Sequence, residues 1–115
     1  MIVDKPWGRV ATHVLNQPSS VRLVTVEPGH HTTPHYHRLR DEAWVVLDDG
    51  VTIAIGDDVV AASAGEEFMV PAEATHTITC TGTERGRVLV IAYGYTSDDD
   101  VLTPEGAPPV ADPDW

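Results

Sequence analysis

The sequence predicts an all-β protein, built as a sandwich or a barrel, and two observations carry this prediction. Short runs rich in valine, isoleucine and threonine recur along the chain, and turn-forming residues separate them at intervals of roughly 8 to 12 residues. No stretch shows the 3.6-residue spacing of apolar positions that is typical of an amphipathic helix.

The predicted strands follow one another along the chain at 21–26, 43–47, 51–55, 59–62, 67–70, 76–81 and 87–95. The acidic tripeptide 48–50 ends in glycine between two apolar runs, a pattern that indicates a tight β-hairpin. Proline is frequent in 103–115 and cannot continue the interior of a sheet. We therefore expect one domain over residues 1–102 and a tail or arm over 103–115, held at least in part by burial of Trp115.

Composition narrows the class of function. The 115 residues carry a formal charge of −11, which argues against nucleic acid or an anionic membrane as a partner. The first ten residues lack the apolar run of a signal peptide, and no stretch is long and apolar enough to span a bilayer. The single cysteine, Cys80, excludes a disulfide within the chain. These features predict a cytoplasmic protein that acts on a small molecule.

Four residues form a candidate metal site. His35 and His37 are two positions apart, so on an extended chain both imidazoles lie on the same face. Glu42 opens the next apolar run, and His76 opens a later one that can lie across from the first. Three imidazoles and one carboxylate that face inward would bind one divalent first-row transition metal with coordination positions left open. Zn, Mn, Fe and Ni all suit such a donor set, as do Cu and Co.

Strand alternation extends this prediction to the neighbouring core. A histidine at the start of a strand is by itself more often a surface or partly buried residue than a ligand, and we expect His30 and His31 to be solvated. If Glu42 and His76 face inward to bind a metal, every second residue after them on the same strand must also face inward. The residues that alternation places inside are Glu42, Trp44, Val46, His76, Ile78 and Cys80.

Two segments of the chain resemble the motifs of the cupin family. The segment 29–50 is similar to the first motif, G-x5-H-x-H-x4-E-x6-G, with its last glycine, Gly50, one residue late. The segment 65–80 is similar to the second motif, G-x5-P-x-G-x2-H-x3-N, but Glu73 replaces the inner glycine and Cys80 replaces the asparagine. The resemblance implies an antiparallel jelly-roll barrel, the double-stranded β-helix of cupins. The matching residues are Gly29, His35, His37, Glu42, Gly65, Pro71 and His76.

A narrower resemblance points to the mannose-6-phosphate isomerase-like cupins. It is carried by "DKPWGRV" at 4–10, "RDEAWVVLDDG" at 40–50 and "GYTSDDDVL" at 94–102. Arg40 matches the arginine that precedes the glutamate in that family. The chain departs from the family at His35, Ala43 and Thr103, where relatives commonly have glutamine, histidine and a basic residue. The resemblance therefore implies the fold of that family more strongly than its substrate. The same resemblance implies a homodimer.

Three functions are compatible with such a site. The first is a metal-dependent enzyme acting on a sugar or sugar phosphate, which would move a proton between adjacent carbons. Arg40, Tyr36 and Tyr93 are the residues predicted to be catalytic, with Glu73 as a further candidate base. Arg38 or Arg40 could bind a phosphate or carboxylate group as a bidentate fork.

The other two functions use the same barrel differently. One is a dioxygenase-type cupin with a non-haem metal and an enolizable or aromatic substrate, which His35 in place of glutamine favours slightly. The other is a module that binds a sugar or small metabolite without catalysis. Oxygen consumption would distinguish the dioxygenase-type cupin from an isomerase.

Overall fold

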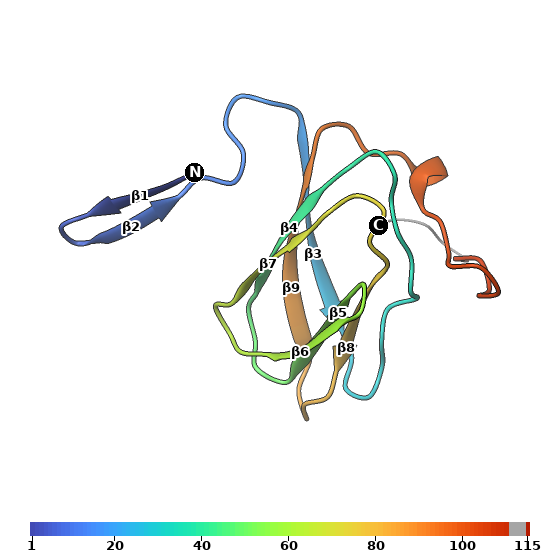
Figure 1. Cartoon of the computed structure of the whole chain (residues 1–115). Coiled ribbons are helices and arrows are strands. Elements are labelled where there is room, and N and C mark those ends of the chain that lie inside the picture. The colour runs from blue at the N-terminus through green and yellow to red at the C-terminus, as the bar shows by residue number, and fades with distance from the viewer. Residues whose placement is uncertain (111–114) are drawn as a thin grey trace.

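Nine strands and one short helix make up the chain, for which a computed structural model describes residues 1–110 and 115 (Figure 1). The strands are β1 (Ile2–Lys5), β2 (Gly8–Ala11), β3 (Ser19–Val26), β4 (Glu42–Val46), β5 (Val51–Ile55), β6 (Asp58–Ala62), β7 (Glu67–Val70), β8 (His76–Cys80) and β9 (Gly86–Tyr93). The 3-10 helix η1 covers Asp98–Asp100. Among the described residues, no helix is long and apolar enough to cross a membrane.

Two antiparallel sheets form the barrel. One contains four strands in the order β3-β9-β4-β7, and the other contains three in the order β6-β5-β8. Every strand pairing is antiparallel. The prediction of an antiparallel all-β double-sheet fold is therefore confirmed, and all seven predicted strands are present to within two residues at each end.

The core lies between the sheets, on the faces that alternation selected. The six residues predicted to face inward along β4 and β8 are all at most 1% exposed. Trp44, the largest of them, pairs in register with Val90 of β9, which is also buried. Ile53 of β5 is also 1% exposed and belongs to this core.

The predicted hairpin at 48–50 is wrong. β4 and β5 flank this turn but lie in different sheets: β4 pairs with β7 and β9, whereas β5 pairs with β6 and β8. The turn therefore carries the chain from one sheet to the other. The sequence pattern of a turn predicts that the chain reverses there. Which strands pair with the two flanking strands depends on the rest of the barrel.

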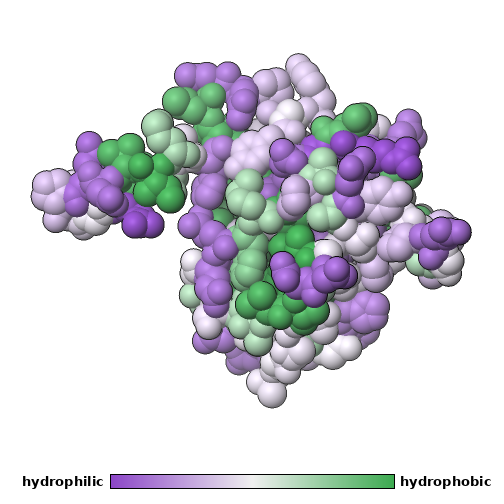
Figure 2. All heavy atoms as spheres, viewed as in Figure 1, coloured by the Kyte–Doolittle hydropathy of each residue, from purple (hydrophilic) through white to green (hydrophobic). Residues whose placement is uncertain are grey.

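The first two strands form a hairpin that stands apart from the barrel (Figure 1). All eight of its strand residues are exposed, and its strands pair only with each other. Figure 2 shows hydrophobic side chains on this projecting hairpin. Met1, Ile2, Trp7 and Val10 are among the large apolar residues that it exposes.

The C-terminal part returns to the barrel. Leu102 pairs with Tyr36 through two main-chain hydrogen bonds of 2.8 and 3.0 Å. Of the tail predicted over 103–115, residues 111–114 lie outside the described residues. Trp115 packs against the hydrophobic core. The proposed boundary at residue 102 stays a prediction.

Candidate metal centre

Three histidines meet inside the barrel. His35 and His37 come from the extended segment between β3 and β4, and His76 is the first residue of β8. The main-chain amide of His76 donates to the carbonyl of His35 at 2.9 Å, which fixes the two segments side by side. The three side chains are at most 3% exposed. The structure thus brings together the three histidines that the sequence nominated.

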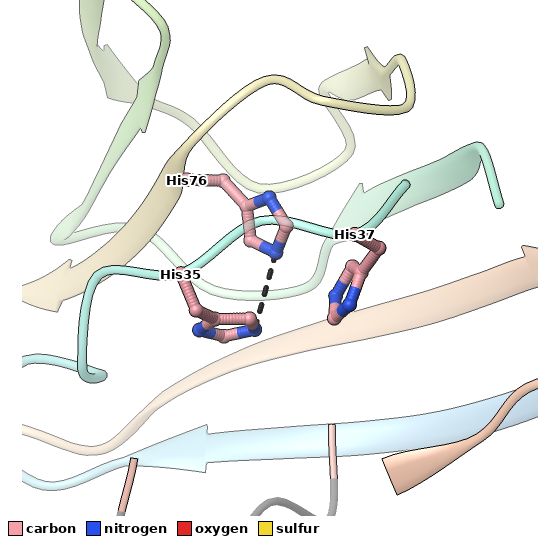
Figure 3. A group of neighbouring side chains, drawn as sticks. All are labelled: His35, His37 and His76. Atoms are coloured by element: carbon pink, nitrogen blue, oxygen red, sulfur yellow. Dashed lines mark hydrogen bonds between the residues drawn. The ribbon is translucent and has the colours of Figure 1, made fainter. Parts of the chain in front are cut away.

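A main-chain carbonyl orients each imidazole. Because a carbonyl oxygen can only accept, the Nδ1 atom that it contacts must carry the hydrogen, and each Nε2 keeps its lone pair. Figure 3 shows the rings turned toward one another, with Nε2 of His35 and Nε2 of His76 3.2 Å apart. Two lone pairs that face each other repel, and a cation between them would remove that repulsion. The carbonyls, taken in the order His35, His37 and His76, are those of Thr33 at 2.7 Å, Asp100 at 2.7 Å and Ala74 at 3.0 Å.

The environment keeps these imidazoles neutral. Burial lowers the pKa of His35 and of His37 below the ordinary value of 6.5. Burial, with a smaller contribution from His35, lowers the pKa of His76 to about 3. Neutral imidazole is the form that binds metals. The three ligand nitrogens lie within 4.8 Å of one another, so this group could hold a metal ion.

Glu42, the fourth predicted ligand, lies beside the histidines. Its Oε2 is 3.7 Å from Nε2 of His37 and accepts a hydrogen bond from Nε of Arg40 at 3.1 Å. Its Oε1 accepts from the indole N–H groups of Trp44 at 2.9 Å and Trp115 at 3.2 Å. Neutral and charged donors thus hold this buried carboxylate at the edge of the cluster, and its role as a ligand stays a prediction.

Arg40 is the predicted catalytic residue that the structure places at the cluster. Its side chain is buried, and its NH2 group donates to Nε2 of His37 at 2.9 Å and to the main-chain oxygen of Trp115 at 2.6 Å. Burial lowers the pKa of Arg40, and the carboxylate of Glu42 opposes this shift. A metal bound to Nε2 of His37 would take the lone pair that Arg40 now uses, which frees one N–H for a substrate oxygen.

Trp115 fills the space next to the histidines. Its ring meets that of His35 edge to face, with centroids 4.7 Å apart, and its centroid is 5.3 Å from that of His76. It also lies 5.5 Å from the ring of Trp44. A residue from the far end of the chain therefore lies against the histidine cluster.

The two predicted catalytic tyrosines lie elsewhere. Tyr93 ends β9 on the face opposite to the buried Ala92, and burial, with the carboxylates of Asp41 and Glu67, raises its pKa. Tyr36 is half-buried between His35 and His37, and its main chain pairs with the C-terminal segment. Alternation therefore directs both tyrosines away from the cluster, and their catalytic role stays a prediction.

Two residues that sequence reasoning missed contribute to the site. The carboxylate of Asp100 accepts the amides of Arg38 and Leu39, both at 2.9 Å, while its carbonyl orients His37. Asp100 stands in a run of three aspartates, which gives no local signal of this contact. The second residue is Arg22, a lone arginine within the apolar run of β3, whose side chain is partly buried.

The double-sheet barrel and its buried histidine cluster define the chain as a cupin. A cupin 2 conserved barrel domain protein from Rhodopseudomonas palustris matches it with a TM-score of 0.70, covering 85% of this chain and 66% of that one, at 13% identity. At this identity the likeness concerns the fold alone. The family described as Mannose-6-phosphate isomerase C-terminal matches residues 1–105, so the chain belongs to that family.

Two curated relatives match the chain over 101 residues. Mannose-1-phosphate guanylyltransferase from Salmonella muenchen is 28% identical over 101 residues, covering 87% of this chain and 21% of that protein. Xanthan biosynthesis protein XanB from Xanthomonas campestris is 26% identical, covering 87% and 22%. The chain thus spans about a fifth of the length of these curated relatives. A solved structure named "Putative sugar phosphate isomerase", from Acidithiobacillus ferrooxidans, is 30% identical with a TM-score of 0.60, covering 67% of this chain and 51% of that one.

Proposed function

We propose that this chain is a metal-dependent cupin enzyme that isomerises a sugar or sugar phosphate. The observation that carries the proposal is the convergence of three Nε2 atoms, each left without a hydrogen because a carbonyl binds the opposite nitrogen; that of His37 accepts from Arg40. Membership of the mannose-6-phosphate isomerase C-terminal family and the likeness to the Acidithiobacillus protein support the choice of substrate class.

The metal would be held by His35, His37 and His76, with Glu42 as the fourth ligand. When bound, a divalent metal would supply polarisation of the carbonyl and hydroxyl oxygens between which the proton moves. Arg40 would donate to a substrate oxygen through the N–H that now binds Trp115. The burial of the histidines would exclude bulk water and strengthen these interactions.

Metal content is the first test. Wild type, purified without chelator or nickel resin, is expected to hold close to one metal per chain by plasma mass spectrometry. His37→Ala should lose most of it, because one of three converging nitrogens is gone. His30→Ala removes an exposed histidine and should retain the wild-type content. A wild type that binds no metal even after reconstitution would contradict the proposal.

Activity on candidate substrates is the second test. The metal-loaded protein should interconvert aldose and ketose forms of a hexose or hexose phosphate without consuming oxygen. Oxygen uptake by the iron-loaded protein on an enolizable or aromatic acid, with no isomerisation, would instead favour a dioxygenase-type cupin. Metal binding without turnover on either set would leave a binding module.

A further inference from the structure

Arg22 faces the interior of the barrel. Along β3 the odd-numbered residues are exposed, whereas Ser20, Arg22, Val24 and Val26 are partly or fully buried. Arg22 pairs in register with Val90 of β9, and Val90 pairs with Trp44 of β4. Because residues in register across a sheet share a face, Arg22 lies on the same inner face as the buried Trp44.

One nitrogen of the Arg22 guanidinium lacks an acceptor among the described residues. Its NH1 atom is buried and has no hydrogen-bond partner among residues 1–110 and 115. Other arginines of this chain are matched to carboxylates: Arg87 binds Asp48 through two side-chain bonds of 2.8 and 3.0 Å. A buried N–H group without an acceptor is unfavourable, because it has lost its water and gained no hydrogen bond in return. An acceptor supplied by a ligand would satisfy it.

A second guanidinium shares this region and already holds an oxygen. Arg40 and Trp44 both donate to the carboxylate of Glu42, and Arg22 lies in register with Trp44 across β9, so the two guanidinium groups border the same part of the interior. Arg40 binds the main-chain oxygen of Trp115 at 2.6 Å, the length of a charge-assisted hydrogen bond. An oxygen of a ligand's anionic group could accept the same N–H in its place.

We propose that Arg22 and Arg40 form an oxyanion subsite beside the three histidines, which binds the phosphate or carboxylate group of a small metabolite in place of the main-chain oxygen of Trp115. The subsite identifies only the charged group of the substrate. The inference that the rest of the substrate is a sugar rests on the proposed function. Guanidinium groups suit this task because they present several N–H donors to an oxyanion at once.

Anion binding by the full-length chain tests the subsite. Inorganic phosphate and acetate would be titrated by calorimetry into wild type, Arg22→Met and Arg9→Met, with and without bound metal. Methionine keeps the apolar stem of Arg22 and removes its charge, and Arg9 is a matched control because it is exposed on the projecting hairpin. Arg22→Met should weaken binding of the preferred anion at least about tenfold, whereas Arg9→Met should change it by less than about twofold.

The two anions distinguish the two sources of the charge. Preference for phosphate would assign a phosphorylated ligand, and preference for acetate would assign a carboxylic acid; either supports the subsite. If neither anion binds wild type, or if Arg22→Met binds both as tightly as wild type, the proposal is overturned.

Thermal unfolding gives a readout that a merely structural arginine would not produce. Without anion, Arg22→Met should unfold at the wild-type temperature or above it, since the substitution removes a partly buried guanidinium with an unpartnered NH1 group. The preferred anion should raise the midpoint of wild type and of Arg9→Met but not that of Arg22→Met. A lower midpoint for Arg22→Met without anion would show a structural partner and would contradict the proposal.

Metal content, measured on the same preparations, separates this inference from the proposed function. Metal in wild type together with anion binding that does not depend on Arg22 would overturn the subsite alone. Anion binding through Arg22 in a chain that holds no metal would overturn the proposed function alone.

Discussion

Each imidazole of the cluster depends on a main-chain carbonyl rather than on a neighbouring side chain. The carbonyls of Thr33, Ala74 and Asp100 select the tautomer that leaves Nε2 without a hydrogen. Such an arrangement tolerates substitution of the side chains of Thr33 and Ala74, because the acceptor belongs to the backbone, whereas the carboxylate of Asp100 has its own partners in the amides of Arg38 and Leu39. It does not tolerate a change of the backbone path between His35 and His37.

The lowered pKa of His76 predicts how stability depends on pH. In the unfolded chain His76 takes up a proton below about pH 6.5, whereas in the folded protein it stays neutral down to about pH 3. Unfolding therefore binds a proton in this window, and the free energy of unfolding must fall as pH decreases from 6.5 toward 3. The loss from this one group is at most on the order of 3–5 kcal/mol.

Denaturant unfolding of metal-free protein between pH 7.5 and 4 checks this prediction. His76→Gln should show a shallower decrease than wild type, and His30→Gln, at an exposed position, should follow wild type. Equal slopes for wild type and His76→Gln would contradict it.

Glu73 occupies the position where the cupin motif has glycine, and its backbone shows the cost. Its φ of 74° lies in the left-handed region, which is unfavourable for a residue with a Cβ by roughly 1–2 kcal/mol. The amide of Glu73 nevertheless donates to the carbonyl of His37 at 2.6 Å, so this strained turn ties the second motif to the first.

Glu73→Gly should stabilise the protein by about 1 kcal/mol, because it relieves the strain and keeps the main-chain bond. Differential scanning calorimetry measures the shift, and Ala72→Gly, at a neighbouring residue of ordinary φ, should instead lower the midpoint. A decrease for Glu73→Gly would mean that its side chain makes a stabilising contact.

At the scale of the elements, alternation fixes which side of each strand meets the site. Trp44 follows Glu42 by two positions on β4, so one strand supplies both a core residue and a carboxylate of the cluster. The turn at 48–50 then moves the chain to the other sheet, which lets β8 approach the histidine segment. Its glycine, one residue later than in the cupin motif, sits at φ 77°.

Gly50→Ala should destabilise the barrel more than the strain at its φ alone would. A Cβ at this position would meet Cα of Gly82 at 2.9 Å, where two connections between strands cross. Gly56→Ala is the matched control, since its φ is also positive but a Cβ there has nothing within 4 Å. Chemical denaturation should show a loss of about 1 kcal/mol for Gly56→Ala and a clearly larger loss for Gly50→Ala. Equal losses would mean that the close approach of Gly50 and Gly82 costs nothing.

At the scale of the whole molecule, the projecting hairpin has no partner within the described chain. Its strands are exposed along their whole length, and Trp7 is 74% exposed. An isolated two-stranded hairpin is only marginally stable in water. We therefore expect the hairpin to pack against a second copy of the chain. It would form part of the interface of the homodimer that the family resemblance implies.

Light scattering at micromolar concentration should report twice the mass of one chain. Replacing Ile2 and Trp7 together by serine should shift the population toward monomer, because it removes apolar area from the contact. Leu39→Ser, which changes a residue 81% exposed outside the hairpin, should leave the dimer intact. A monomeric wild type would count against this assembly.

The sequence by itself determined the strands, their inward faces and the histidine set. Each of these depends on local chemistry: β-branched runs between turns, a two-residue period, and ligands two positions apart near the start of a strand. His35 and His37 had to share a face once their segment was extended. His76 was predicted from its place in the second cupin motif, at the start of a strand.

Only the tertiary structure decided what else reaches the site. Asp100 and Trp115 come from distant parts of the chain, and no local pattern specifies a contact across 60 or more positions. The inward direction of Arg22 depends on which face of β3 the other sheet covers, and the assignment of β4 and β5 to different sheets depends on their partners. Periodicity is a property of neighbours along the chain, whereas the pairing of segments follows from the free energy of the whole barrel.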